Sequence, residues 1–204
     1  MTAEKRPAVE KKPRIGVLAL QGDFEAHLKA LERAGADAVE VRTDADLDAV
    51  DGLVIPGGES TTMLKLLEVE DLFGPLASFG AQKPVFGTCA GAILLATEVK
   101  NPSQASLGLL DLTVERNGYG RQIDSRISEI EVAGKKLEAV FIRAPIIRRV
   151  GEAARVLASY DGTAVLVEQG QHMVATFHPE LTGDTSIHRY FVEKVAAGVL
   201  RRSY

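Results

Sequence analysis

Short apolar runs alternate with segments of helical periodicity through the first half of the chain. The runs 37–41, 52–55 and 84–86 are predicted as short strands, and 14–20 is so continuously apolar that its strand should be covered on both faces. Between them, Phe24, Leu28 and Leu31 recur with helical spacing, and a second helix is expected to begin near Ser60 or Thr61. Strands that alternate with helices predict an α/β fold with a mostly parallel sheet, whose ligands bind beyond the carboxyl ends of the strands.

The second half of the chain has a different pattern. The segments 109–115, 127–132 and 137–142 alternate more strictly between apolar and polar positions, as antiparallel or edge strands do. Two short strands at 155–159 and 164–168 are predicted around a turn at Asp161-Gly162, and a further apolar strand covers 172–177. A last helix from about 186 to 201 would bury Ile187, Phe191 and Val195.

Composition and charge narrow the class of protein. The 204 residues suffice for one well-buried domain, which we place at 14–204, after a flexible, mixed-charge leader at 1–13. With 24 basic and 28 acidic side chains the net charge is -4, which argues against nucleic acid as a partner. No apolar run reaches membrane-spanning length, and the single cysteine cannot form an internal disulfide. We therefore expect a cytoplasmic protein that does not bind membranes.

That single cysteine lies in a motif with its own chemistry. Gly87-Thr88-Cys89-Ala90-Gly91 follows a short strand and precedes an apolar helix. Glycines at this spacing permit the sharp strand-to-helix turn that presents a nucleophile in hydrolases. The same turn places the sulfur at a helix N-terminus, where the thiolate is favoured. A lone cysteine is otherwise most often a small buried apolar residue, so the glycines are what favour a nucleophile.

A cysteine nucleophile needs a base, and His178 is the best candidate of the four histidines. It follows the apolar strand at 172–177, and Pro179 favours an extended backbone at this position. In an extended segment residues two apart point the same way, so Glu180 would orient the imidazole. Cys89, His178 and Glu180 thus form a candidate triad, while a simple turn is the competing interpretation of His-Pro-Glu. The other histidines are interpreted as surface or packing residues: His27, His172 and His188.

Acyl transfer also requires hydrogen-bond donors for the oxyanion. The N–H of Ala90, directly after the nucleophile, is the first candidate. The second would come from Gly57-Gly58, on the neighbouring loop at the same end of the sheet, and in particular from Gly58. From the residues alone, a tight turn before a helix is an equally good interpretation of these two glycines.

The elbow and His178-Pro179-Glu180 together resemble the triad-type (class I) glutamine amidotransferases. Three further stretches narrow the resemblance to the glutaminase subunits of two-component pyridoxal 5'-phosphate synthases: Leu18-Ala19-Leu20-Gln21-Gly22-Asp23-Phe24, Pro56-Gly57-Gly58-Glu59-Ser60-Thr61 and Arg116-Asn117-Gly118-Tyr119-Gly120-Arg121-Gln122. The resemblance runs from Arg14 to the C-terminal end, and no motif position departs from it.

This resemblance implies a flavodoxin-like three-layer αβα sandwich with a mostly parallel central sheet. Cys89 would be the nucleophile, His178 the acid and base, and Glu180 its orienting carboxylate. L-glutamine would be bound by a set drawn from three loops: Gly58, Glu59, Ser60, Arg116, Ile142 and Arg143. An arginine suits a bidentate grip on the α-carboxylate, although without the resemblance each arginine would be interpreted as a surface ion-pair partner.

The same resemblance implies that ammonia is released through a γ-glutamyl thioester and passes to a synthase subunit, with no cofactor or metal in this chain. It also implies that the partner completes the oxyanion hole, so that the isolated subunit would be slow. Three alternatives stay open. These are a glutaminase for another ammonia-using synthase, such as one that makes an imidazole or aminobenzoate intermediate, a cysteine-dependent hydrolase or chaperone of the related superfamily, and a non-catalytic regulatory subunit.

Overall fold

The computed structural model describes residues 12–117 and 125–202. Its elements follow the chain in the order β1 (Arg14–Leu18), α1 (Phe24–Arg33), β2 (Asp37–Val41), α2 (Asp44–Asp48), β3 (Gly52–Ile55), α3 (Ser60–Val69), α4 (Phe73–Gln82), β4 (Val85–Thr88), α5 (Ala90–Leu95), β5 (Ala96–Lys100), β6 (Leu110–Glu115), β7 (Ser125–Val132), β8 (Lys135–Ile142), β9 (Ile146–Val150), β10 (Arg155–Tyr160), β11 (Thr163–Gln169), β12 (His172–Ala175), the 3-10 helix η1 (Pro179–Leu181) and α6 (Ser186–Arg202).

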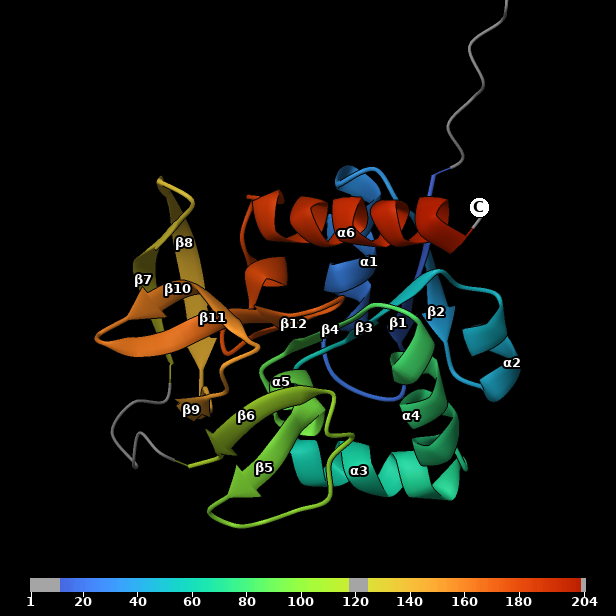
Figure 1. Cartoon of the computed structure of the whole chain (residues 1–204), viewed down its shortest axis with the longest axis horizontal. Coiled ribbons are helices and arrows are strands. Elements are labelled where there is room, and N and C mark those ends of the chain that lie inside the picture. The colour runs from blue at the N-terminus through green and yellow to red at the C-terminus, as the bar shows by residue number, and fades with distance from the viewer. Residues whose placement is uncertain (1–11, 118–124, 203–204) are drawn as a thin grey trace, which may run out of the picture.

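A seven-stranded sheet forms the middle layer, with the order β10-β11-β12-β4-β3-β1-β2. The five strands from β12 to β2 are parallel, and β11 and β10 continue the sheet antiparallel at one edge. Helices α1 and α6 cover one face, and α3, α4 and α5 lie on the other (Figure 1). The predicted α/β class and its mostly parallel central sheet are confirmed.

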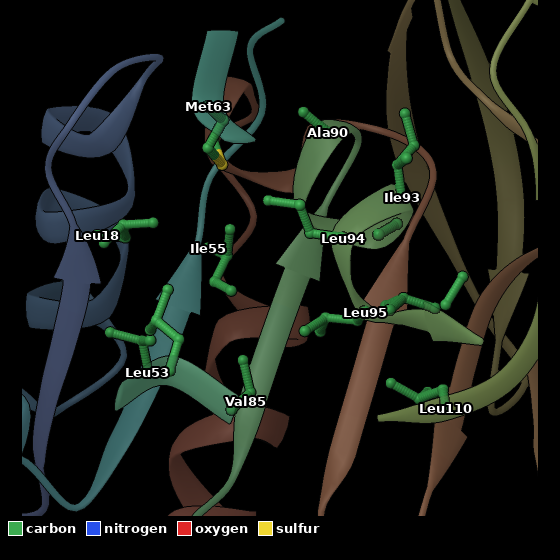
Figure 2. Close-up of a cluster of buried hydrophobic side chains, with 14 of the residues drawn as sticks. Leu18, Leu53, Ile55, Met63, Val85, Ala90, Ile93, Leu94, Leu95 and Leu110 are labelled. Atoms are coloured by element: carbon green, nitrogen blue, oxygen red, sulfur yellow. The ribbon is translucent and has the colours of Figure 1, made fainter. Parts of the chain in front are cut away.

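Two apolar cores fill the spaces between these layers. Successive residues of the buried strands point to opposite faces, so Leu53 and Ile55 pack with α3 and α5 while Val54 packs beneath α6. In Figure 2, Leu53, Ile55 and Val85 lie with Leu94 and Leu95 of α5 in the first of these cores. Burial on both faces explains why the sequence of these strands is continuously apolar.

The strands predicted in the second half of the chain form smaller sheets beside the central one. Strands β7 and β8 make an antiparallel hairpin, and β6 pairs parallel with β5 and antiparallel with β9. The turn at Asp161-Gly162 joins β10 to β11 as expected, with positive φ at both residues. Strand β8 ends at Ile142. Its last residue and the following Arg143 lie near Cys89 of the elbow.

Five elements were not predicted: α2, α4, β5, β9 and the 3-10 helix η1. Helix α4 contains Gly74, Pro75 and Gly80, which are poor helix formers, and it exists because Leu76 and Phe79 are buried against the core. Of the leader expected at 1–13, only the last two residues are among those that the structure describes. Gly118 and Gly120, which belong to the motif at 116–122, lie outside the described residues. Within the described ranges, no helix is long and apolar enough to span a membrane.

Candidate active site

The elbow predicted around Cys89 is present at the junction of β4 and α5. Cys89 has φ 48° and ψ −102°, a left-handed backbone that non-glycine residues rarely adopt. Its N–H donates to the carbonyl oxygen of Ala175 at 2.9 Å, which fixes the turn to the neighbouring strand β12. Cys89 is buried and stands immediately before the first helical residue, Ala90. The strained turn therefore holds the sulfur at a helix N-terminus.

The two glycines of the elbow are required because backbones approach closely there. A Cβ atom at Gly87 would lie 2.5 Å from the carbonyl carbon of Gly91. A Cβ atom at Gly91 would lie 2.1 Å from the carbonyl oxygen of Ile55 on β3. Both distances are shorter than van der Waals contact and involve backbone atoms, which cannot rotate away. The spacing that predicted the elbow thus reflects packing of α5 against β3 and β4.

This packing predicts a large loss of stability in Gly91→Ala. The added methyl group must displace the backbone of β3 or α5, so we expect the free energy of unfolding to fall by about 2 kcal/mol or more. Urea denaturation of the variant measures the change. Gly74→Ala is the matched control, because a Cβ atom there meets nothing within 4 Å. A Gly91→Ala protein as stable as the wild type would contradict the account of the elbow.

His178 and Glu180 lie beside the elbow, but the backbone between them differs from the prediction. Strand β12 ends at Ala175, and Pro179–Leu181 form a 3-10 helix instead of an extended segment. The side chains meet nevertheless, because Nδ1 of His178 lies 2.7 Å from Oε1 of Glu180. The N–H of His178 donates to the carbonyl oxygen of Val140 at 2.8 Å, which fixes this turn to β8.

The imidazole of His178 carries a positive charge in this setting. Burial disfavours the charge, but hydrogen bonds with Cys89 and Glu180 outweigh burial and raise the pKa of His178 to about 10. The thiol of Cys89 also lies 3.8 Å from the carbonyl oxygen of Ile142. The structure thus aligns a sulfur, an imidazole and a carboxylate in the order that nucleophilic catalysis requires.

A cavity of about 260 Å³ opens over the sulfur. It is lined by most of the residues predicted for the site, namely Gly58, Glu59, Ser60, Cys89, Arg116, Ile142, Arg143 and His178. Ala90 and Glu180 lie behind this lining, next to Cys89 and His178 respectively. The cavity is also lined by three residues that were not predicted to bind substrate: Asp23, Ile93 and Asn117. The volume suits a small amino acid.

Of the two arginines, Arg143 alone has a guanidinium group without a partner among residues 12–117 and 125–202. Arg116 donates to Oε1 of Glu59 at 3.3 Å and to the hydroxyl of Thr61 at 2.8 Å. Arg143 is exposed, has φ 43°, and makes no hydrogen bond or ion pair with the part of the chain that the structure describes. A positive group that faces the cavity without a partner is available to a carboxylate.

Glu59 caps helix α3, the role that sequence analysis gave to Ser60 or Thr61. Its carboxylate accepts hydrogen bonds from the N–H groups of Thr61 and Thr62 at 3.0 and 2.6 Å. Burial would raise the pKa of Glu59, but these bonds and the Thr62 hydroxyl lower it to about 2. Ser60 is buried and donates to Oε1 of Gln104 at 3.0 Å. Glu59 therefore holds Arg116 at the cavity while it caps the helix.

The Gly57-Gly58 loop is packed directly against the histidine. A Cβ atom at Gly57 would lie 2.4 Å from Cε1 of His178, and Gly58 has φ 142°. The Gln21 side chain contacts the backbone of the next residue, Glu59, through Nε2 to its oxygen and Oε1 to its N–H, each at 3.4 Å. Both contacts are long for hydrogen bonds, so Gln21 holds this loop only weakly.

Asp23, His178 and Glu180 offer ligand atoms that lie within 4.8 Å of one another, a grouping that a metal ion could accept. His178 and Glu180, however, are already hydrogen-bonded to each other. Removing that bond to bind a metal would dismantle the pair that orients the imidazole. The grouping therefore serves proton transfer better than metal binding.

A cysteine on a strained strand-to-helix turn, beside a buried histidine and carboxylate, is the arrangement typical of enzymes that transfer acyl groups through a cysteine nucleophile. Comparison with known proteins identifies the particular group. The chain belongs to the SNO glutamine amidotransferase family, whose sequence profile matches residues 17–197.

Relatives of known name support this assignment. The pyridoxal 5'-phosphate synthase subunit PdxT of Solibacter usitatus is 60% identical over 190 residues, which cover 89% of this chain and 99% of the relative. PdxT of Koribacter versatilis is 56% identical, with coverage of 91% and 97%. A solved glutamine amidotransferase superimposes with a TM-score of 0.84 at 46% identity, covering 89% of this chain and 98% of that one. The flavodoxin-like three-layer fold and the resemblance to glutaminase subunits are thereby confirmed.

Two histidines that sequence analysis had treated as surface or packing residues lie close to the triad. His27 and His188 are completely buried, and Nε2 of His27 lies 3.3 Å from Oε2 of Glu180. Helical spacing in the sequence could have indicated the burial of His27, because this residue follows Phe24 by three positions and precedes Leu31 by four. That spacing places it on the buried face of α1.

Proposed function

We propose that this chain hydrolyses L-glutamine in the cavity over Cys89, as the glutaminase subunit of pyridoxal 5'-phosphate synthase. The observation that carries the proposal is the alignment of Cys89, His178 and Glu180 beneath a cavity that the guanidinium group of Arg143 lines. Family membership and the names of the 60% and 56% identical relatives support the substrate and the complex.

Acylation begins with the sulfur of Cys89. The thiolate attacks the γ-carbonyl carbon of glutamine and forms a tetrahedral intermediate. The N–H of Ala90, which has no partner within α5 because it stands at the first position of the helix, and the N–H of Gly58 stabilise its oxyanion. When the carbon–nitrogen bond breaks, the imidazolium of His178 donates its proton to the nitrogen, and ammonia leaves. A γ-glutamyl thioester on Cys89 and a neutral imidazole remain.

Deacylation uses the same groups in reverse. The neutral imidazole of His178 takes a proton from water, whose oxygen attacks the thioester carbonyl. Collapse of the second tetrahedral intermediate breaks the carbon–sulfur bond, releases glutamate and regenerates the thiolate. Glu180 keeps the imidazole oriented and stabilises its charge through the 2.7 Å bond to Nδ1. The reaction requires neither a cofactor nor a metal.

Recognition of glutamine follows from the charges at the cavity wall. Arg143 grips the α-carboxylate, and Arg116 adds a second positive charge that Glu59 holds in place. The Glu59 carboxylate is exposed and ionised at neutral pH, so it can also accept from the α-ammonium group. The backbone of Gly58, Ser60 and Ile142 then surrounds the side chain of the substrate.

Ammonia passes to a synthase subunit that assembles pyridoxal 5'-phosphate, and this partner completes the oxyanion hole. The Gly57-Gly58 peptide is the natural moving part, because Gly58 has a backbone that favours glycine and Gln21 holds the loop only through 3.4 Å contacts.

The reaction takes place in the cytoplasm, where a nucleophilic thiol stays reduced.

The experiment that tests this function measures ammonia release from glutamine by the chain alone and with its pyridoxal 5'-phosphate synthase partner. We expect slow hydrolysis by the isolated chain and a strong rise in kcat with the partner, because docking orients the oxyanion donors. A removed donor typically costs about 10²–10³-fold in kcat, which sets the scale of the rise.

Synthases that make imidazole or aminobenzoate intermediates from ammonia are the controls, since a glutaminase of another pathway would respond to one of them. Stimulation by such a synthase in place of the expected partner would redirect the assignment. The absence of ammonia release in every mixture would overturn the enzymatic function and favour a regulatory subunit.

A further inference from the structure

A chain of buried polar side chains continues inward from the triad. Oε1 of Glu180 bonds to His178, and its other oxygen, Oε2, faces Nε2 of His27 at 3.3 Å. The same nitrogen lies 3.1 Å from the hydroxyl of Thr88, the residue before the nucleophile. Nδ1 of His27 lies 3.0 Å from Nε2 of His188 on α6. Four elements, α1, β4, η1 and α6, therefore meet at the imidazole of His27.

Neither inner histidine carries a positive charge. Burial lowers the pKa of His27 well below its usual value, and the neighbouring His188 and His178 add to this effect. Burial, helped by Arg33 on α1, also lowers the pKa of His188 to about 4. Each ring therefore holds a single N–H at neutral pH and can donate only one hydrogen bond.

The position of each proton follows from the partners. Nδ1 of His188 is buried and has no hydrogen-bond partner among the described residues. A proton there would leave a buried donor unsatisfied, so His188 carries its proton on Nε2 and donates to Nδ1 of His27. His27 must then carry its own proton on Nε2. In the opposite tautomer, a lone pair of His27 would face Oε2 of Glu180 at 3.3 Å, a buried oxygen that has no hydrogen-bond partner in the described ranges.

We propose that His27 is a positioning residue of the glutaminase site, a role that rests on the proposed function. Oriented by His188, its Nε2–H donates to Oε2 of Glu180 and to the hydroxyl of Thr88, and so holds the carboxylate and the elbow in register. At 3.3 Å the contact with Oε2 lacks hydrogen-bond geometry in this structure, and catalytic hydrogen bonds often form fully only when substrate binds. His27 touches neither substrate nor the reacting atoms and acts entirely through Glu180 and Thr88.

Through Glu180, His27 affects the pKa of the His178 imidazole. A donor to Oε2 stabilises the charge of the Glu180 carboxylate, which in turn stabilises the imidazolium. Without His27, the pKa of His178 would fall, and the acid that protonates the departing amide nitrogen would be lost at a lower pH. The alkaline limb of the kcat/KM profile reports this loss.

The kinetic test compares His27→Leu, which removes the donor, with His27→Gln, whose amide N–H can replace Nε2–H. Both are assayed with the synthase partner, together with His172→Asn as the control. His172 is also buried, but its Nδ1 accepts from the N–H of Val85, away from the site. We expect His27→Leu to lower kcat by about 10–100-fold with little change in KM, the scale for partners that orient a catalytic group.

The accompanying pH profiles separate positioning from packing. The alkaline limb of His27→Leu should move to lower pH, and His27→Gln should restore both the limb and most of kcat. Unchanged kinetics in His27→Leu would overturn the proposal, as would a loss of kcat that leaves the limb in place and that His27→Gln does not restore. An inactive wild type would instead reject the proposed function itself.

Should His27→Leu fail to fold, the wild-type protein provides a second test. Long-range proton–nitrogen NMR spectra of histidine-labelled protein distinguish the two neutral tautomers and the cation. We expect His27 as the neutral Nε2–H tautomer and His178 as the cation at neutral pH. Observation of His27 as a cation, or as the Nδ1–H tautomer, would overturn the proposal without any measurement of activity.

Discussion

Replacing Cys89 with alanine is expected to abolish ammonia release while leaving the fold and glutamine binding intact. No other described residue at the cavity offers a comparable nucleophile, so the rate should fall by roughly 10⁶-fold, the scale seen when a triad loses its nucleophile. The side chain makes only a 3.8 Å contact with the Ile142 oxygen and a hydrogen bond with His178. Its removal therefore costs little stability. Stopped assays of ammonia with the synthase partner present measure the effect.

Calorimetric titration of Cys89→Ala with glutamine is the control for this loss. We expect binding close to that of the wild type, because the arginines and the Gly58 loop are unchanged. A variant that binds glutamine but releases no ammonia isolates the chemical step at the sulfur. Residual hydrolysis at a substantial fraction of the wild-type rate would show that another group attacks the amide.

His178→Asn is expected to lower kcat by about 10²–10⁴-fold, the contribution of a positioned acid and base. In the wild type, hydrogen bonds with Cys89 and Glu180 raise the pKa of His178 to about 10. The imidazolium is therefore present through neutral pH and is lost only as the pH rises through that value. We expect wild-type kcat/KM to persist into the alkaline range, and the variant to lack the alkaline limb that His178 creates.

His172→Asn makes the same substitution at a buried histidine outside the site. Burial lowers the pKa of His172 to about 4, so it is neutral and contributes no proton in the working range. We expect its kcat and pH profile to match the wild type. Equal losses of kcat in both variants would mean that buried histidines matter through packing, and would contradict the assigned role of His178.

Local motifs in the sequence predicted the features that depend on neighbouring residues. The elbow follows from Gly87 and Gly91, because the close backbone approaches that require glycine occur within one strand-to-helix turn and its supporting strand. The alternation of strands and helices likewise predicted the parallel sheet. These elements are specified by short-range pattern and by burial on both faces.

The contact between His178 and Glu180 was predicted, but the backbone conformation that produces it differs from the prediction. An extended segment was expected to align the two side chains, whereas a 3-10 turn brings them within 2.7 Å. The contact survives because the turn is tied to β8 through Val140, and the sequence holds no local sign of that link. The capping of α3 by Glu59 was missed for a similar reason, since serine and threonine are the stronger capping signals.

Features that depend on distant segments could not be derived from local pattern. Helix α4 forms despite Gly74, Pro75 and Gly80 because its apolar residues complete a core to which twelve other elements contribute. The contact between His27 and His188 joins positions 161 residues apart. Helical spacing could have indicated that each histidine is buried, but only the packing of α1 against α6 shows that they meet.

The most direct test of the central claim is covalent capture of Cys89 by a glutamine analogue with an electrophilic carbon in place of the amide. The complex with the synthase partner is treated with the analogue, and the modified peptide is identified by mass spectrometry. We predict one label per chain, located on Cys89, with loss of ammonia release in proportion to labelling and protection by glutamine. Inactivation without a label on Cys89, or labelling that glutamine does not slow, would contradict glutamine hydrolysis at this site.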